Sequence, residues 1–368
     1  MDQHATWIAV NPVQGCPKVC SYCFLNERGQ TAVRPEQLAS PAETADLLAS
    51  SPFYEPDRPI ALYTWTDVMA LPASRAHLVE LLDVLVQCQV PNPVVLITKC
   101  AIPDDTLDAV VKARKAGLRL IVYVSYSGLG RDVEHGIRHD ELKANFPRLA
   151  QAGVPIVHYW RPAFPESATE ATMETVLAWA AEYAHCTVAA GLKVEPDALP
   201  RLAGLWPELA TTPGVTEAEG VYPREFWEFI HATHQRHPGY PLFHTNSCAL
   251  AYVLGTTDRF GVFGSEVCTL RNQCPTQQRR RCEADVLRRP HLTETMIDTA
   301  LNRRGHPAPF TFDQTRGEVE VHQALPTNVV AALTQDLGVR VRVTRQHDDP
   351  YWNSGTAGAV PLILGDAR

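Results

Sequence analysis

The sequence predicts an α/β fold: a partial (β/α)6 barrel of the TIM type with a cysteine-rich C-terminal extension and a small α/β appendage. Two patterns support this prediction. Within roughly the first 200 residues, six apolar segments of strand length alternate with segments whose apolar residues recur at helical spacing. Near the C-terminus, residues 319–346 show a strand, helix and strand pattern. Because strands that alternate with helices pair in parallel through right-handed crossovers, the first pattern indicates an open or partial barrel.

The predicted strands and helices follow one another with short connections. The strands span residues 5–12, 58–67, 92–100, 118–127, 154–162 and 186–194, and the helices span residues 41–51, 74–88, 105–117, 140–153 and 172–184. We expect a barrel domain over residues 1–200, and the extension with its appendage over residues 201–368. A chain of 368 residues, 45% of them apolar, can bury a sizeable core.

Polar residues stand where the second to fifth predicted strands end. They are Thr64, Thr66 and Asp67 after the second strand, Thr98, Lys99 and Cys100 after the third, Ser125 after the fourth and Arg161 after the fifth. In barrels of parallel strands, chemistry collects at the C-terminal ends of the strands. This rim is therefore the candidate active site.

Three cysteines directly follow the first predicted strand. Cys16, Cys20 and Cys23 have the spacing C-x3-C-x2-C, and Tyr22 lies between the last two. Structural zinc normally takes four protein ligands, and no second cysteine pair lies close by in the sequence. A [4Fe–4S] cluster held by three cysteines keeps one iron free for a substrate or cofactor. The loop therefore favours an iron–sulfur cluster.

This cysteine spacing, with an aromatic residue before the last cysteine and a βα series after it, resembles the radical S-adenosylmethionine superfamily. The resemblance covers about the first 200 residues. Within the superfamily, four segments resemble the spore photoproduct lyase-like branch: "LYTWTDVMALP", "VLITKC", "SYSGLGRDVEHG" and "LAQAGVPIVHYWRPAFPES". The chain departs from that branch at Val68 and His135, where the branch has proline, so repair of DNA is not implied.

The resemblance implies a cofactor set and a reaction. Cys16, Cys20 and Cys23 would ligate a [4Fe–4S] cluster, and its fourth iron would bind S-adenosylmethionine. An electron from a flavodoxin- or ferredoxin-type donor would cleave the cofactor, and the 5′-deoxyadenosyl radical would abstract hydrogen from a substrate. The sequence does not identify that substrate, which could be a nucleotide or nucleic acid, or alternatively a small metabolite or peptide.

The resemblance also gives the rim residues roles in cofactor binding, each beside a structural alternative. The expected cofactor-binding residues are Tyr22, Thr64, Thr66, Asp67, Thr98, Lys99, Ser125 and Arg161. The residues after the second strand could bind the methionine amino group or simply cap the strand end. Lys99 could bind a carboxylate or lie at the surface. Arg161 could bind the cofactor carboxylate with both ends of its guanidinium group, and Ser125 could bind the ribose hydroxyls. Tyr22 could line the adenine side of the pocket or pack the loop against the barrel.

Cys100 is the candidate catalytic residue on this rim. Its thiol could return a hydrogen atom to a product radical. A small side chain that fills the core is the favoured alternative.

A second group of cysteines lies in the C-terminal half. Cys248, Cys268, Cys274 and Cys282 have the spacing C-x19-C-x5-C-x7-C. Three interpretations stay open: a second [4Fe–4S] cluster, a structural zinc site, or scattered free thiols. The proline after Cys274 favours a cluster, because proline often follows a ligand in ferredoxin-type motifs.

The composition of the chain limits which binding partners and which cellular compartment we expect. A net charge of −8 argues against broad, non-specific nucleic-acid binding. No segment is apolar enough to span a membrane, and the first ten residues lack the features of a signal peptide. We therefore expect a cytoplasmic protein, no membrane partner, and cysteines that act as ligands. The remaining alternative is a non-catalytic metal-binding or redox protein, against which the polar rim argues.

Overall fold

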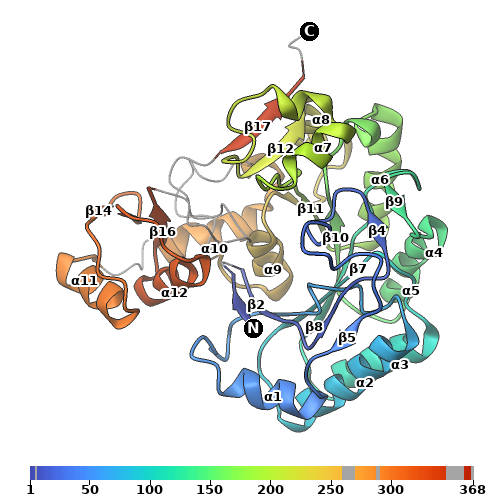
Figure 1. Ribbon diagram of the computed structural model, residues 1–368, viewed down its shortest axis with the longest axis horizontal. Helices are drawn as coiled ribbons and strands as arrows, with labels where there is room; N and C mark the ends of the chain where they lie inside the picture. The colour runs from blue at the N-terminus through green and yellow to red at the C-terminus, as the bar shows by residue number, and fades with distance from the viewer. Residues whose placement is uncertain (5, 259–269, 287–290, 345–359, 366–368) are drawn as a thin grey trace.

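The computed structural model describes residues 1–4, 6–258, 270–286, 291–344 and 360–365. Its main feature is an eight-stranded sheet with the order β1-β2-β6-β7-β8-β10-β11-β13 (Figure 1). These strands are β1 Asp2–Gln3, β2 Ile8–Val10, β6 Ile60–Leu62, β7 Val94–Thr98, β8 Leu120–Val124, β10 Ile156–Trp160, β11 Cys186–Ala189 and β13 Leu242–Phe243. All neighbours from β2 to β13 pair in parallel, and β1 pairs antiparallel with β2. The predicted mixed α/β fold with a large parallel sheet is confirmed.

The sheet contains the six predicted strands in sequence order, together with two that the sequence pattern did not predict. Strands β1 and β13 have two residues each, which is too short for an alternation pattern to show. Strand β13 pairs in parallel with β11, and Leu242 lies opposite Thr187. The main sheet therefore includes a strand from beyond residue 200.

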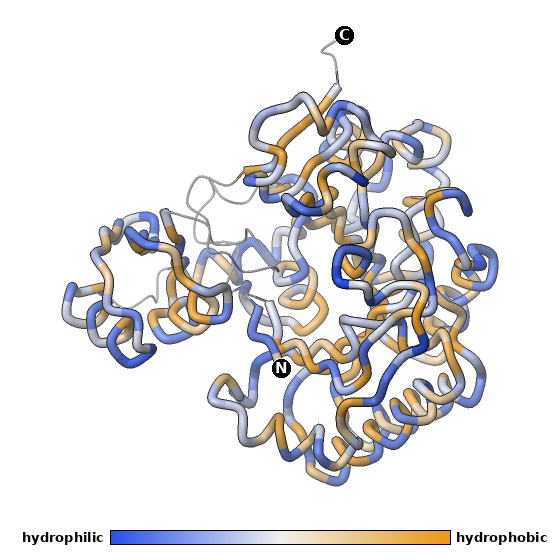
Figure 2. Tube along the Cα trace, in the orientation of Figure 1, coloured by the Kyte–Doolittle hydropathy of each residue, from blue (hydrophilic) through white to orange (hydrophobic). Residues whose placement is uncertain are grey.

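Helices connect successive strands of the sheet. They are α1 Pro41–Ala49, α2 Pro72–Gln87, α3 Asp104–Lys115, α4 His139–Lys143, α5 Asn145–Gln151 and α6 Glu170–Tyr183. Helix α1 begins with a capping box, in which Ser40 and Glu43 each accept a hydrogen bond from the other's backbone N–H. Helix α2 buries Leu78, Leu81 and Leu85, which share one helical face, in the main core. Figure 2 shows hydrophobic and hydrophilic residues alternating along these helices.

The single helix expected over residues 140–153 is wrong in one respect, because it is divided into two. Helix α4 ends at Lys143, and α5 begins at Asn145. Pro147 has no N–H to donate, and in a continuous helix its ring would clash with the carbonyl of Lys143. The break therefore follows from the proline.

Two short antiparallel pairs lie in the loops that follow strands of the sheet. Strand β3 (Val13–Gln14) pairs with β5 (Glu36–Gln37), and β4 (Val19–Cys20) pairs with β9 (Glu134–His135). The chain after β11 forms α7 Leu199–Leu205, β12 Gly220–Pro223, α8 Arg224–Arg236, α9 Asn246–Leu254 and α10 Thr276–Val286, and β12 pairs with β17 Pro361–Leu364. Short 3-10 helices span Pro165–Ser167, Pro207–Ala210 and Arg271–Gln273.

A small α/β unit lies beside the main sheet (Figure 1). It consists of α11 Glu294–Arg303, β14 Phe310–Asp313, β15 Glu318–Val321, α12 Thr327–Leu337 and β16 Arg340–Val343. Strand β15 pairs antiparallel with β14 and parallel with β16, and residues such as Leu301, Leu333 and Val341 form a separate core. The predicted strand, helix and strand are thus β15, α12 and β16. In the described parts of the chain, no helix has the length and apolarity needed to cross a membrane.

His158 in β10 gives a testable pH dependence of stability. Its side chain is fully buried, with Nδ1 2.9 Å from Thr187 Oγ1 and Nε2 2.8 Å from the Tyr126 carbonyl oxygen. Burial lowers the pKa of His158 from 6.5 to about 4. Below pH 6.5 the unfolded chain binds a proton that the folded chain does not accept until about pH 4. The free energy of unfolding should therefore fall by about 3 kcal/mol over this range because of His158.

Urea unfolding of the wild-type protein and of His158→Gln at pH 7 and pH 4.5 measures this contribution. The variant should lose less stability than the wild type as the pH falls. An equal loss in both proteins would contradict this assignment.

Candidate functional site

The three N-terminal cysteines lie on a loop that leaves the C-terminal end of β2. Gly15 turns the chain at φ +90°, and a Cβ there would lie 2.9 Å from Val33 Cγ2, so the position requires glycine. The backbone N–H of Cys16 donates to the Gln30 carbonyl at 2.7 Å. Cys20 belongs to β4 and lies opposite Glu134 of β9. The loop is therefore held on both sides by backbone contacts.

Asn26 closes the second half of this loop. Its Nδ2 donates to the carbonyl oxygens of Cys20 at 3.0 Å and Cys23 at 2.8 Å. Its Oδ1 accepts from Thr31 Oγ1 at 2.7 Å. These hydrogen bonds fix the turn from Cys20 to Cys23. No pattern in the sequence predicts this role of Asn26.

The three thiols share one electrostatic neighbourhood. Burial raises the pKa of Cys16 to about 11 and of Cys20 to about 12, and it also raises the pKa of Cys23. Cys23 further raises the pKa of Cys16, and both raise that of Cys20. Lys99 acts in the opposite direction on Cys20, and Arg161 does so on Cys23. Cations therefore lie close enough to stabilise the thiolates.

Among the described residues, no group of three His, Cys, Asp or Glu side chains is placed to hold a metal ion. Binding of a cluster by the cysteine loop therefore stays a prediction.

Glu134 joins the cysteine loop to the rim of the sheet. Its side chain is fully buried, and Oε1 accepts from Lys99 Nζ at 2.7 Å, from Ser127 Oγ at 2.9 Å and from the Tyr22 hydroxyl. The Lys99 ammonium also lies 5.5 Å from the centre of the Tyr22 ring. Glu134 was quoted within a sequence motif but was not predicted as a site residue, because the sequence alone did not show that its carboxylate is buried.

Asp67 connects the ends of β6 and β7. Its Oδ1 accepts from Thr98 Oγ1 at 2.8 Å, and its Oδ2 accepts from the backbone N–H of Lys99 at 2.7 Å. It also contributes to raising the pKa of Cys16. Asp67 therefore acts as a strand-end cap, which was the structural alternative, and it places a carboxylate beside the cysteine loop.

Two buried polar atoms near the ends of β2 and β6 have no hydrogen-bond partner among the described residues. They are Asn11 Nδ2 and Thr66 Oγ1. Asn11 Oδ1 accepts from Thr64 Oγ1 at 3.1 Å and from the backbone N–H of Trp65 at 3.2 Å. A buried polar group left unpaired costs about 1–3 kcal/mol, so such atoms suit a bound ligand or water. Asn11 was not predicted, although it directly follows the first strand.

Lys99 brings together residues from the ends of three strands. Its Nζ donates to the carbonyl oxygens of Ser125 at 3.2 Å and Arg161 at 3.3 Å. Arg161 Nη1 in turn donates to the Tyr159 hydroxyl at 2.9 Å, which also accepts from Asn246 Nδ2 at 3.2 Å. Lys99 is therefore an inward-facing residue, and the exposed surface position considered as an alternative is wrong.

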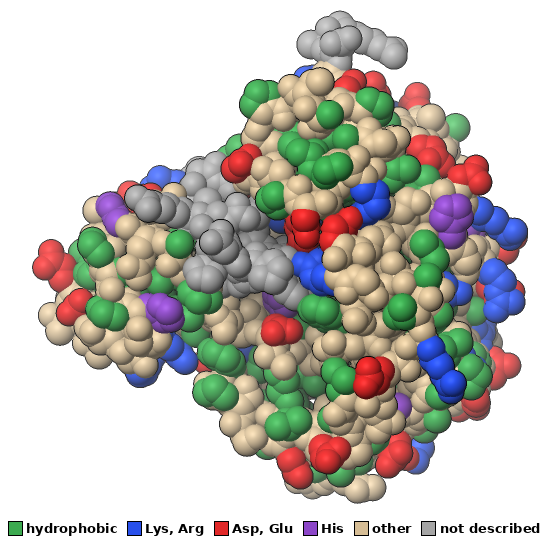
Figure 3. All heavy atoms as spheres, in the orientation of Figure 1, with side chains coloured by type: hydrophobic (Ala, Val, Ile, Leu, Met, Phe, Trp, Pro, Cys, Tyr) green, Lys and Arg blue, Asp and Glu red, His purple; other side chains and the backbone are tan. Residues whose placement is uncertain are grey.

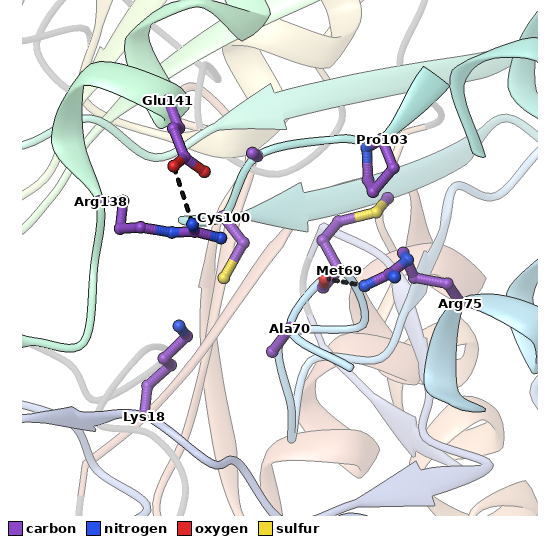
Figure 4. A pocket seen from close by; sticks show the side chains of 9 residues that line it. Lys18, Met69, Ala70, Arg75, Cys100, Pro103, Arg138 and Glu141 are labelled. Carbon is purple, nitrogen blue, oxygen red and sulfur yellow. Dashed lines mark hydrogen bonds and ion pairs between the residues drawn. The ribbon is translucent and has the colours of Figure 1, made fainter. Parts of the chain in front are cut away.

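Cys100 lies at a cavity of about 240 Å³, and its backbone N–H donates to Thr98 Oγ1 at 2.9 Å (Figure 4). Burial raises the pKa of its thiol, as do Asp67 and Cys16. The lining also includes Lys18 and Arg75. None of the expected cofactor-binding residues lines this cavity, so it is distinct from the rim around Lys99.

Two of the C-terminal cysteines, Cys248 and Cys282, lie near Asp258. Cys248 Sγ donates to Asp258 Oδ2 at 3.1 Å. Burial raises the pKa of Cys282, and Asp258 lies within electrostatic range of its sulfur. Cys274 packs against the same hydrophobic cluster as Cys248. Cys268, the fourth predicted ligand, lies outside the described residues.

No protein-family model matches the chain, and no curated protein matches it. Among solved structures, SuiB of Streptococcus suis bound to S-adenosylmethionine is similar at 11% identity and TM-score 0.44, covering 63% of this chain and 48% of that one. A variant of spore photoproduct lyase with dinucleoside spore photoproduct is 14% identical with TM-score 0.45, covering 64% and 75%. A radical SAM methyltransferase from Sphaerobacter thermophilus is 10% identical with TM-score 0.38, covering 55% and 63%. The chain thus spans about half the length of SuiB, and arguments about its function rest on its own residues.

Proposed function

We propose that this chain is a radical S-adenosylmethionine enzyme whose loop cysteines, Cys16, Cys20 and Cys23, hold a [4Fe–4S] cluster. The observation that carries the proposal is that the three cysteines lie on one loop at the C-terminal edge of a parallel sheet, where Asn26 and the β4–β9 pair fix the loop. The three-cysteine motif and the order of the strands support the same assignment. A partial barrel over residues 1–200 is part of the proposal, and the extension over residues 201–368 adds β13 to its sheet.

The chemistry of the residues suits both groups. Three cysteines on one loop are the ligand type that an iron–sulfur core takes, and their thiols would lose their protons when they bind it. The unpaired Thr66 Oγ1 and Asn11 Nδ2 offer an acceptor and a donor for the polar groups of S-adenosylmethionine. Arg161 supplies a buried positive charge for a carboxylate, with one of its donors directed to Tyr159.

When bound, the cluster and S-adenosylmethionine would supply one electron and a cleavable C5′–S bond, giving a 5′-deoxyadenosyl radical that abstracts hydrogen from a substrate. The chain's own residues position these groups. The Lys99–Glu134 pair holds Tyr22 against the cysteine loop, where its ring can cover the adenine. Asp67 fixes Thr98, while Ser125 and Thr64 complete the polar rim. Cys100 keeps its hydrogen because its pKa is raised, as return of a hydrogen atom requires.

The proposed substrate is a nucleotide or nucleic acid, or alternatively a small metabolite or a peptide. On the face drawn in Figure 3, acidic and basic side chains are interspersed. A flavodoxin- or ferredoxin-type electron donor completes the proposal because the reaction consumes one electron. A reducing, cytoplasmic compartment completes it because free thiols persist there.

We also propose that Cys248, Cys274 and Cys282, together with Cys268, bind a second cluster or a zinc ion. The support is that Cys248 and Cys282 both lie against Asp258, so two thiols that are far apart in sequence share one neighbourhood. We assign no step of the reaction to this site.

Anaerobic reconstitution with iron and sulfide tests the proposed function. With dithionite and S-adenosylmethionine, the wild-type protein should release 5′-deoxyadenosine even without substrate. About eight irons per chain would indicate two clusters, and about four irons with one zinc would make the second site structural. A reconstituted protein with iron but no cleavage of S-adenosylmethionine would point to the non-catalytic alternative.

A further inference from the structure

The cavity at Cys100 has a basic lining that the proposed reaction does not use. Lys18 comes from the cysteine loop, Arg75 from α2, and Arg138 from the segment before α4 (Figure 4). Glu141 is the one carboxylate in the lining, and it pairs with Arg138 at 2.8 Å. Three cations against one carboxylate leave the lining with a formal charge of +2, in a chain whose net charge is −8.

The other two cations make their described hydrogen bonds to neutral oxygens. Lys18 Nζ donates to the Gly136 carbonyl at 2.6 Å, and Arg75 Nη1 donates to the Met69 carbonyl at 2.9 Å. Their positive charge is therefore not cancelled by these contacts. A local positive field on an acidic protein attracts acidic molecules to one place and repels them elsewhere.

The cavity lies next to the cysteine loop. Cys100 lies in its lining and within electrostatic range of both Cys16 and Lys18. Its outer edge reaches solvent, since the side chain of Arg138 is 73% exposed and that of Glu141 44%. Pro103 adds a partly exposed apolar residue to the lining, whereas Met69 is 2% exposed. Arginines beside apolar atoms are common at protein interfaces.

We propose that the basic side of this cavity, formed by Lys18, Arg75 and Arg138, is where an acidic electron-donor protein docks. The inference rests on the proposed function, which consumes one electron at the cysteine loop. The donor's flavin or iron–sulfur centre is oxidised by one electron, the group held by Cys16, Cys20 and Cys23 is reduced by one, and no bond changes at the pocket. Docking beside Cys16 shortens the path that the electron must cross.

A protein fits this pocket better than a small anion does. Figure 4 shows the three cations on different sides of the cavity, with Arg138 directed to Glu141. A phosphate or carboxylate is held tightly where several donors converge on it, often with an arginine presenting both ends of its fork. Dispersed positive charge instead steers a partner with dispersed negative charge and raises its association rate.

The test compares two reductants with Arg75→Glu/Arg138→Glu. Lys115→Glu/Arg119→Glu is the matched control, because it makes the same change in charge at two exposed residues near the start of β8, at the opposite edge of the sheet. Cleavage of S-adenosylmethionine is measured with dithionite, a small reductant, and with reduced flavodoxin, an acidic one-electron donor. Thermal unfolding checks the fold, and Arg138→Gln, at an exposed position, replaces the double variant if that variant unfolds.

We expect the flavodoxin-driven rate at low salt to fall about tenfold in the double variant, and its salt dependence to flatten. The dithionite-driven rate should not change, and the control should match the wild type with both reductants. Equal flavodoxin-driven rates in all three proteins, with dithionite cleavage intact, would overturn the docking site alone. If dithionite gives no cleavage even in the wild type, the proposed function fails and this inference fails with it.

Calorimetric titration with inorganic phosphate separates a small-anion site from a docking site. No phosphate binding, together with the slower flavodoxin reaction, supports docking. Phosphate binding that the double variant loses, without an effect on the flavodoxin rate, would show that the pocket binds a small anion and would overturn the proposal.

Discussion

Replacing Cys20 by alanine should remove about four irons per chain and abolish release of 5′-deoxyadenosine. Cys20 is the most enclosed of the three loop cysteines, since it is 8% exposed and belongs to β4, which pairs with β9. Lys99 and Glu134 both act electrostatically on its thiol. Two remaining thiolates cannot hold a cluster whose third ligand is missing. Iron analysis, sulfide analysis and chromatography of the cleavage products measure both effects.

Cys88→Ala is the matched control for this loss. Cys88 is exposed at the C-cap of α2 and takes no part in either proposed metal site. This variant should keep the wild-type iron content and cleavage. Full cleavage by Cys20→Ala, or an equal loss in Cys88→Ala, would refute the assignment of the loop.

Replacing Glu134 by glutamine should destabilise the protein by about 3 kcal/mol. The carboxylate is fully buried and pairs with Lys99, whose side chain is 17% exposed. Removing one partner of a buried ion pair leaves the other charge in a poorly solvated place, which typically costs about 3–5 kcal/mol. Urea unfolding at pH 7 gives the change in the free energy of unfolding.

The double variant Lys99→Met/Glu134→Gln should be more stable than Glu134→Gln alone, because it no longer buries an unpaired ammonium. Asp83→Asn breaks an exposed pair with Lys112 and should cost less than about 1 kcal/mol. A similar small cost for Glu134→Gln would mean that the buried pair does not hold the loop.

The strand series could be predicted because each central strand is almost continuously apolar and ends in polar residues. Strands β7, β8 and β10 have five residues each, enough for their apolar runs to stand out. Strand β13 could not be predicted, because two residues are too few to show the alternation of apolar and polar residues typical of a strand. Its place in the sheet depends on backbone pairing with β11. The break before α5 is encoded by Pro147, although the helical spacing around it predicts one continuous helix.

The site was predictable where it depends on position along the chain, and less so where it depends on tertiary contact. The spacing predicts Cys16, Cys20 and Cys23 as cluster ligands, and the positions after the strands predict Asp67, Lys99 and Arg161 as rim residues. Glu134 and Asn11 were missed, because their importance comes from burial and from the partners they meet. Contacts such as that of Glu134 with Tyr22, which lie 112 residues apart in the sequence, have no local signal there.

Electron paramagnetic resonance of the reduced, reconstituted protein, with and without S-adenosylmethionine, tests the central claim most directly. The Cys248→Ala/Cys274→Ala/Cys282→Ala variant should be used, so that only the N-terminal loop can contribute a cluster. The account predicts a reduced [4Fe–4S] signal whose shape changes when S-adenosylmethionine binds the iron that has no cysteine ligand. No such signal, or a signal that S-adenosylmethionine leaves unchanged, would contradict it.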